Sequence, residues 1–419
     1  MRPSTATSPD NPAARPVPST TAVVLAGALT LAVAMGIGRF AFTPLLPLMM
    51  QEGLIDAAVG AELAAVNYLG YLVGALTVAR LAGRPLRLVQ ACLLAIVLLT
   101  AGAGLASTEP VWVALRFGAG VASAWAMVGI SSWSLSTLAL RGQGAWGALV
   151  FGGVGGGIML AGGLAWMSPT GGARALWLQL AAVAGVLGGV VLGLTWQALR
   201  PVAVAASPVA LAAAPVPPPT RSAALPAGSW PLVICYGSFG FGYILPATFL
   251  PAMARALVDD PQRFGLAWPL FGLAALASTL IAVRGLQQWP PLRAWAICQA
   301  AVGLGAALPL ISQTGAAIAA AALLVGGTFV VATLIGLQQA RALMPHHPAR
   351  LLGRMTAAFA GGQILGPLAV RALAGVRLGP WGALEISSAA AALLMAGTAA
   401  WLWRLGGVSS TSAGPARRG

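Results

Sequence analysis

GIGRFAFTPLLPLM, residues 36–49, places the permanently charged Arg39 inside an apolar segment that runs from Thr21 to Met50. At about 1.5 Å per residue such a helix is roughly 45 Å long, more than the ~30 Å hydrocarbon core of a bilayer. With the segment centred near Gly36, Arg39 lies about 5 Å beyond the midplane. An arginine facing lipid there costs about 2.5–3.5 kcal/mol, so we expect its side chain to face a protein-lined interior.

Two prolines, Pro44 and Pro47, follow Arg39 closely. Each removes a backbone N–H and frees a carbonyl, so we expect the helix to bend here. In a membrane the freed groups must find water or a neighbouring helix. Both prolines are therefore candidate helix breaks with a role in gating.

The same phrase returns as GFGYILPATFLPAM at residues 240–253, offset by 204 residues from the first copy. The offset aligns several Gly, Leu, Pro and Met positions, and it places Tyr243 where Arg39 stands in the first copy. Pro251 aligns with Pro47, and Pro246 is a further candidate break in the second copy. Each copy opens a half of similar length, so the repeat predicts a chain built from two duplicated halves.

Composition assigns the chain to the polytopic membrane proteins, because 58% of its residues are hydrophobic, 7% are charged and the mean hydropathy is +0.87. We therefore expect the chain to be embedded in a lipid bilayer. The net charge of +15 comes from arginine alone, since the chain contains no lysine. Its three cysteines fall in different apolar segments without paired spacing, which indicates neither a disulfide framework nor a metal site.

The remaining apolar segments complete a pattern of twelve spans, all of membrane length. After the first span they lie at 58–79, 86–106, 110–139, 144–166, 174–197, 230–256, 264–284, 291–312, 316–341, 351–374 and 380–404. A proline-rich stretch, 198–229, reads as an extended cytoplasmic linker between the halves. We predict an all-α membrane protein with six-helix bundles at 21–197 and 230–404, a disordered tail at 1–20 and a C-terminal tail at 405–419.

Arginine bias across short loops gives the orientation. Sixteen arginines lie on the side of the two termini and five on the other side, with two inside the spans. This distribution predicts cytoplasmic termini and makes the basic charge a topology signal, so nucleic acid is not an expected partner. Missing lysine with abundant Ala, Gly, Pro and Arg indicates a bacterium, hence its inner membrane.

Several kinds of chemistry have no residues to perform them. His346 and His347 are adjacent in a loop, no metal-ligand cluster occurs, and no glycine-rich loop ends in lysine. We therefore expect no metal, no cofactor, no ATP-driven pump and no enzyme. No carboxylate lies near the middle of a span, which weighs against a proton relay or a site for cationic drugs.

The residues left inside the spans are positive or neutral. Arg116 in the fourth span lies at about the depth of Arg39, and two arginines at one level make an anion site conceivable. The alternative is that one or both arginines satisfy backbone carbonyls at a helix break, such as the one before Pro44.

Polar residues in two other spans are further candidates for substrate contact. Asn67 and Tyr71 share one face of the second span, and Gln363 lies in the eleventh, where Pro367 is a candidate break. Hydrogen bonding between helices is the alternative role for these side chains.

Three phrases carry a family resemblance: GIGRFAFTPLLPLM at 36–49, NYLGYLVGAL at 67–76 and GRMTAAFAGGQILGP at 353–367. With the R-x-x-x-G-x-x-x-A spacing that begins at Arg116, the chain resembles the major facilitator superfamily, and more narrowly its YbfB/YjiJ-like branch. The resemblance implies alternating access around a central site formed by both halves. The loop at 80–87, RLAGRPLR, departs from the superfamily pattern because it lacks an aspartate. The G-P pattern of antiporters is also missing from the fifth span.

The leading hypothesis is a secondary active transporter of a small organic solute, preferably an organic anion, that acts as a monomer. Arg39 and Arg116 would draw the anionic group toward the midplane. One alternative is efflux of hydrophobic drugs or metabolites, since fourteen Trp and eleven Phe could line an apolar cavity. Another is a receptor or scaffold that binds without transporting.

Overall fold

The computed structural model describes residues 18–78, 81, 84–168, 171–199, 229–257, 265–285, 289–344 and 348–411. Most of the predicted tails and linker therefore lies outside the described residues, as do His346 and His347. The first span is interrupted: α1 (Thr20–Leu31) passes into a π-helix, η1 (Ala32–Ile37), and α2 (Phe42–Gln51) follows a turn at 38–41.

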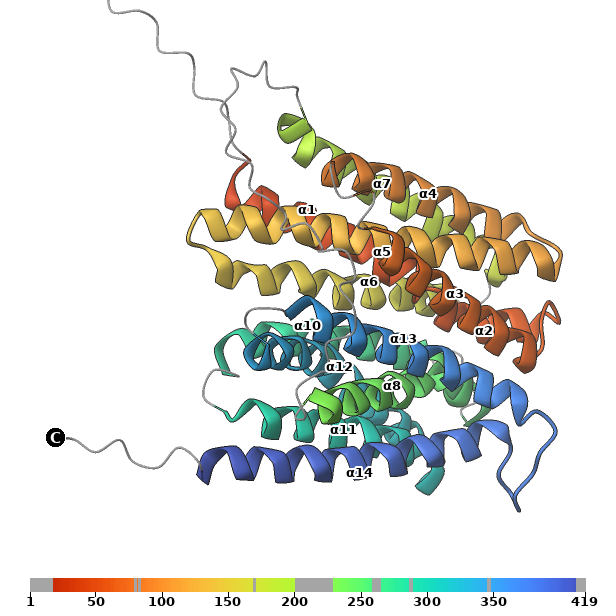
Figure 1. Ribbon diagram of the computed structural model, residues 1–419. Helices are drawn as coiled ribbons and strands as arrows, with labels where there is room; N and C mark the ends of the chain where they lie inside the picture. Colours follow the sequence, from red (N-terminus) through yellow and green to blue (C-terminus); the bar gives the residue numbers. More distant parts are fainter. Residues whose placement is uncertain are drawn as a thin grey trace, which may run out of the picture.

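The other helices follow in two sets, separated by the proline-rich stretch, and the two sets form the two bundles seen in Figure 1. The first set is α3 (Ala57–Thr77), α4 (Pro85–Leu105), α5 (Glu109–Leu140), the short η3 (Gly144–Trp146), α6 (Gly147–Met167) and α7 (Gly172–Leu199). The second set is α8 (Trp230–Leu257), α10 (Ala267–Gly285), α11 (Pro291–Ile311), α12 (Gly315–Leu343), α13 (Pro348–Ala372) and α14 (Ala383–Thr411).

Ten helical segments in the described part of the chain are long and apolar enough to cross a membrane. The interrupted first helix counts as one of them, and α10 and α13 bring the total to twelve. α10 qualifies as a shorter apolar helix, Ala267–Ile281, whereas α13 carries the polar Arg354, Gln363 and Arg371. The predicted all-α membrane fold is confirmed.

The bend expected after Arg39 begins before the prolines. In η1 and the following turn, Gly38 N–H donates to Val33 O at 2.9 Å and Phe40 N–H donates to Met35 O at 3.0 Å, each five residues back. This wider turn is typical of functional sites in helices. Pro44 lies in the first turn of α2, where a missing N–H costs little, and Pro47 lies inside that helix.

The other candidate breaks do not interrupt their helices, so that expectation is wrong. α8 is helical through Pro246 and Pro251, and α13 is helical through Pro367. A proline frees the carbonyl four residues earlier, which for Pro251 is that of Ala247. The hydroxyl of Thr43, in the other bundle, donates to this carbonyl at 3.0 Å. A helix can continue past proline when a neighbour satisfies the freed carbonyl.

The two bundles repeat the same helix packing. In the first, Gly36 of η1 lies so close to α6 that an added Cβ would meet the backbone of Gly157 at 2.4 Å. In the second, Gly240 of α8 lies against α13, and an added Cβ would meet Phe359 O at 2.2 Å. Between bundles, α3 packs on α13, α6 on α10 and α2 on α8. These pairs are those that a twofold rotation relating the bundles would produce.

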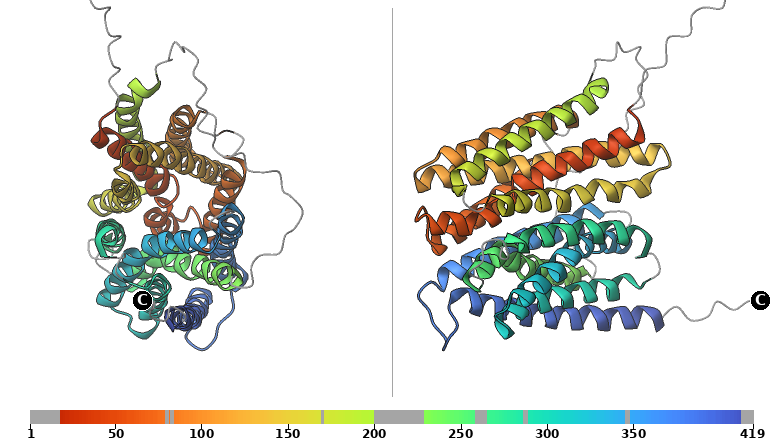
Figure 2. Two further views of the ribbon diagram at one scale, coloured as in Figure 1. Left: turned by 60° about the vertical axis from the view of Figure 1, so that its left-hand side comes forward. Right: turned by 180° about the vertical axis from the view of Figure 1, so that it is seen from behind.

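The bundles are joined at the end of the molecule where α2 ends and α3 begins, which we call the outer end (Figure 2). Arg371 Nη1 of α13 forms a salt bridge of 2.6 Å with Glu62 Oε2 of α3. Arg255 Nη2 of α8 donates to Gln51 Oε1 of α2. Because both side chains of the salt bridge are partly exposed, it contributes at most about 1 kcal/mol, and it can open and close readily.

We expect Glu62→Gln to loosen the outer end, because Arg371 loses its charged partner. The reporter is Thr248→Cys in a background without the native cysteines, since Thr248 is buried and hydrogen-bonded to Tyr68 across the bundles. Labelling of this cysteine by an impermeant maleimide, added from the outer side, should accelerate up to about fivefold. Glu109→Gln, at an exposed position of α5, is the control and should leave the rate unchanged. An unchanged labelling rate with Glu62→Gln would show that the salt bridge between Glu62 and Arg371 does not hold the outer end closed.

Candidate functional site

Arg39 lies in the turn between η1 and α2 and faces the other bundle. Its side chain is 3% exposed, and its Nη2 donates to Gln363 Oε1 of α13 at 2.6 Å. The guanidinium also lies 4.1 Å from the ring centre of Tyr71 in α3, a cation–π distance. The sequence-based expectation of an inward-facing arginine agrees with this placement.

Gln363 joins the two repeat-equivalent positions. Its carbonyl oxygen accepts from Arg39, and its Nε2 donates to the hydroxyl of Tyr243, which is the residue at the position of Arg39 in the second copy. We call Arg39, Tyr71, Tyr243 and Gln363 the central cluster. Four of the predicted site residues, from four different spans, thus lie together between the bundles.

The central cluster holds one formal positive charge. In the part of the chain that the structure describes, the hydrogen bonds and ring contacts of Arg39 all go to neutral groups. Its Nε is buried and has no hydrogen-bond partner within the described ranges. A buried charge is ordinarily paired with an opposite charge, so the cluster is suited to accept an anionic group.

Arg116 has a different environment, although it is equally buried. Its Nη2 donates to Arg39 O at 3.2 Å, and its Nη1 lies 3.5 Å from Gly38 O, both in the broken turn. The guanidinium also stacks over the ring of Phe42 at 4.7 Å. This geometry supports the alternative in which Arg116 satisfies backbone carbonyls, and it makes Arg116 a positioning residue for Arg39.

The space beside Arg116 is small. A cavity of about 10 Å³, lined in part by Gly38, Arg116 and Trp177, has room for about one water molecule. Arg116 Nε and Trp177 Nε1 are both buried without a partner in the described part of the chain, so a water there would have donors to bind. An organic solute would not fit in this space.

Asn67 belongs to the same support. Its Nδ2 donates to Arg116 O at 2.8 Å, which links α3 to α5. Gly120, one turn after Arg116, lets the helices approach, since an added Cβ would lie 2.1 Å from Asn67 O. Asn67 thus makes the hydrogen bond between helices that was raised as the alternative, while its Oδ1 is buried and has no hydrogen-bond partner among the described residues.

Aromatic rings cover the second-bundle side of the central cluster. Tyr243 lies parallel to Phe329 of α12 and to Phe359 of α13, with ring centres 5.6 Å apart in both pairs. Phe239, one turn earlier in α8, stacks on Tyr243 at 5.3 Å. Phe359 precedes Gln363 by four residues, so helical spacing puts the two on one face, whereas no sequence signal distinguishes Phe329 from the other aromatic residues.

Two polar contacts between the bundles were not expected. Tyr68 and Thr248 pair through their hydroxyl groups at 2.9 Å, and Thr43 donates to Ala247 O. Tyr68 precedes Tyr71 by three residues, so helical spacing could have suggested it. Thr43 and Thr248 carried no such signal, because hydroxyl groups within spans often bond to their own helix. Among the described residues, no group of three His, Cys, Asp or Glu could hold a metal ion.

Comparison with known proteins now gives the family. The family model described as uncharacterised MFS-type transporter YbfB matches residues 31–401. A search of curated proteins finds no match. Among solved structures, the D-xylose-proton symporter is similar, with a TM-score of 0.68 at 14% identity over 92% of this chain and 96% of that chain. The nucleoside transporter NupG gives 0.62 at 13% identity over 92% and 98%.

The two solved structures share the fold with this chain, and the family model covers nearly all of its spans. The sequence resemblance to the major facilitator superfamily and its YbfB-like branch is confirmed by this match. The chain belongs to the MFS-type transporter family represented by YbfB.

Proposed function

We propose that the protein is a secondary active transporter that moves a small organic anion across the bacterial inner membrane by alternating access. The observation that carries the proposal is the buried guanidinium of Arg39, whose contacts in the described part of the chain are with neutral groups. A carboxylate is the natural partner, because an Arg–carboxylate pair is charge-assisted and can be bidentate.

The position of Arg39 connects binding to movement. The residue belongs to the first bundle, and its hydrogen-bond partner Gln363 belongs to the second. An anion bound here would replace the Gln363 oxygen as acceptor, and this would weaken one contact between the bundles. Substrate binding can shift a conformational equilibrium only through such differential contacts.

The contacts between the bundles indicate the side on which this state is closed. Thr43, Glu62 and Gln51 all bond to the second bundle at or toward the outer end. Arginine bias supports cytoplasmic termini, so this arrangement corresponds to a state closed toward the periplasm.

Both similar structures are named for small polar solutes, a nucleoside and D-xylose, which supports a small organic substrate. We propose a monomer as the working unit.

Efflux of hydrophobic compounds is the second candidate, because aromatic side chains surround Tyr243. Under that proposal uncharged compounds would be preferred and Arg39 would be dispensable. A receptor or scaffold would bind a solute without flux. Transport assays with charged and uncharged solutes separate these possibilities.

We expect Arg39→Gln to abolish counterflow of small carboxylates in liposomes. Removing one partner of a buried charged pair costs about 2–5 kcal/mol, which corresponds to at least a ~30-fold loss. Arg39→Lys keeps the charge but not the bidentate geometry, so it should retain partial activity. Arg174→Gln, an exposed arginine of α7, is the matched control and should transport normally. Normal transport by Arg39→Gln would refute the site.

Arg116→Gln, unlike Arg39→Gln, should lower the stability of the protein. It leaves buried carbonyls of the broken turn without a donor, at about 1–3 kcal/mol of unfolding free energy. Arg39→Gln removes a charge that has no anionic partner among the described residues, so it should not lower thermal stability in detergent. Tryptophan-fluorescence melting curves of the two variants, recorded beside the wild type, compare these effects. The reverse order of stability would contradict the division of roles.

A further inference from the structure

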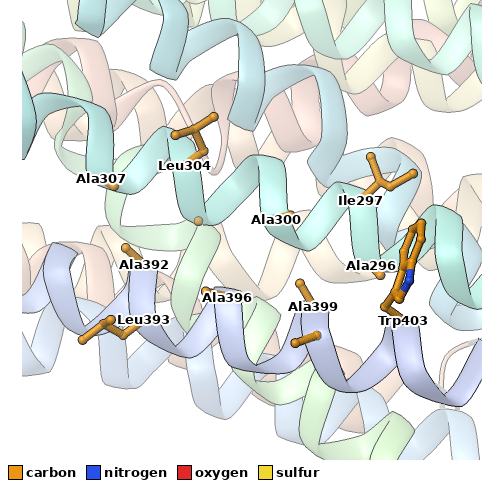
Figure 3. A pocket seen from close by; sticks show the side chains of 12 residues that line it. Ala296, Ile297, Ala300, Leu304, Ala307, Ala392, Leu393, Ala396, Ala399 and Trp403 are labelled. Atoms are coloured by element: carbon orange, nitrogen blue, oxygen red, sulfur yellow. The ribbon is translucent and has the colours of Figure 1, made fainter.

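A groove between α11 and α14 is remote from the central cluster. Its volume is about 660 Å³, and its lining in the described part of the chain consists of apolar residues and one glycine (Figure 3). Small side chains create the space: Ala296, Ala300 and Ala307 on α11, with Ala392, Ala396 and Ala399 on α14.

The groove opens toward the surface of the bundle. Leu304 and Leu393 on its two sides are 50% and 75% exposed, so in a membrane they face lipid. From Ala296 to Ala307 the helix rises about 16 Å, close to half of the ~30 Å hydrocarbon core. The groove therefore has the length of an acyl chain from a single leaflet.

One end of the groove is basic. Trp403 closes it at the end where α11 begins and α14 ends, the side of the chain termini. The guanidinium of Arg293 lies 5.3 Å from the Trp403 ring centre, and its Nε is buried and finds no hydrogen-bond partner among the residues that the structure describes. Arg404 follows Trp403 in α14, and the first turn of α11 adds the positive end of a helix dipole at the same end of the groove.

We propose that this groove binds an anionic phospholipid from the leaflet on the side of the termini. One acyl chain lies between the alanines of α11 and α14, and the phosphate lies against Arg293. The charge at one end and the apolar length beyond it together define a lipid of this class. The inference is independent of the transported solute.

Native mass spectrometry of the full-length protein in detergent tests the proposal with phosphatidylglycerol and phosphatidylcholine of identical chains. Phosphatidylglycerol should bind at least about fivefold more tightly, because a basic residue near the headgroup favours anionic lipid. Arg293→Gln should remove this preference. Arg174→Gln, an exposed arginine of α7 at the outer end of the other bundle, should preserve it. Equal binding of the two lipids, or an unchanged preference in Arg293→Gln, would overturn the proposal.

Filling the groove tests the acyl-chain part. Ala300→Trp should lower the binding of phosphatidylglycerol, whereas Ala182→Trp on the exposed face of α7 should not. Glycerol phosphate, which has the headgroup chemistry without chains, should not compete. Competition by glycerol phosphate would show that a free phosphate suffices. If Ala300→Trp left lipid binding unchanged but abolished a dimer, the groove would be the contact with a second copy of the chain. Either result would overturn the proposal.

Discussion

This structure depends on the burial of the Arg39 guanidinium between the two bundles, where its partners among the described residues are neutral. Arg39 reaches that position because the first span is broken at 38–41. The broken turn exposes carbonyls, and Arg116 satisfies them from α5. Asn67 and Gly120 then bring α3 and α5 together behind Arg116. Arg116 is thus needed because the broken turn has free carbonyls, and Asn67 is needed because it bonds the carbonyl of Arg116.

The repeat explains how the bundles meet. Two contacts join residues that are 204 positions apart, Thr43 with Ala247 and Gln51 with Arg255. This is the offset between the repeated phrases, so each contact pairs a residue with its own equivalent. Such a pair must lie close to the rotation axis that relates the bundles. The central cluster departs from the symmetry, since Arg39 is replaced by Tyr243 in the second copy, and this departure creates a site with one charge.

The sequence predicted the fold well because a bilayer imposes strong rules on length and hydropathy. It also brought Arg39, Tyr71, Tyr243 and Gln363 forward as candidates, since polar residues in spans are rare. It did not separate their roles from those of Arg116 and Asn67, because a buried arginine looks the same in sequence whether its partners are carbonyls or a ligand. The uninterrupted helix at Pro251 depends on Thr43, a partner 208 residues earlier in the chain, which no local pattern reveals.

The central claim is that Arg39 is the partner of an anionic group of the substrate. The most direct measurement is calorimetric binding of matched pairs of small organic acids and their primary amides to the wild-type protein, since each pair has one shape and differs in charge. If Arg39 binds an anionic group, at least one acid should bind about tenfold or more tightly than its amide, a difference of ~1.4 kcal/mol. Amides that bind as well as their acids throughout the series would contradict it.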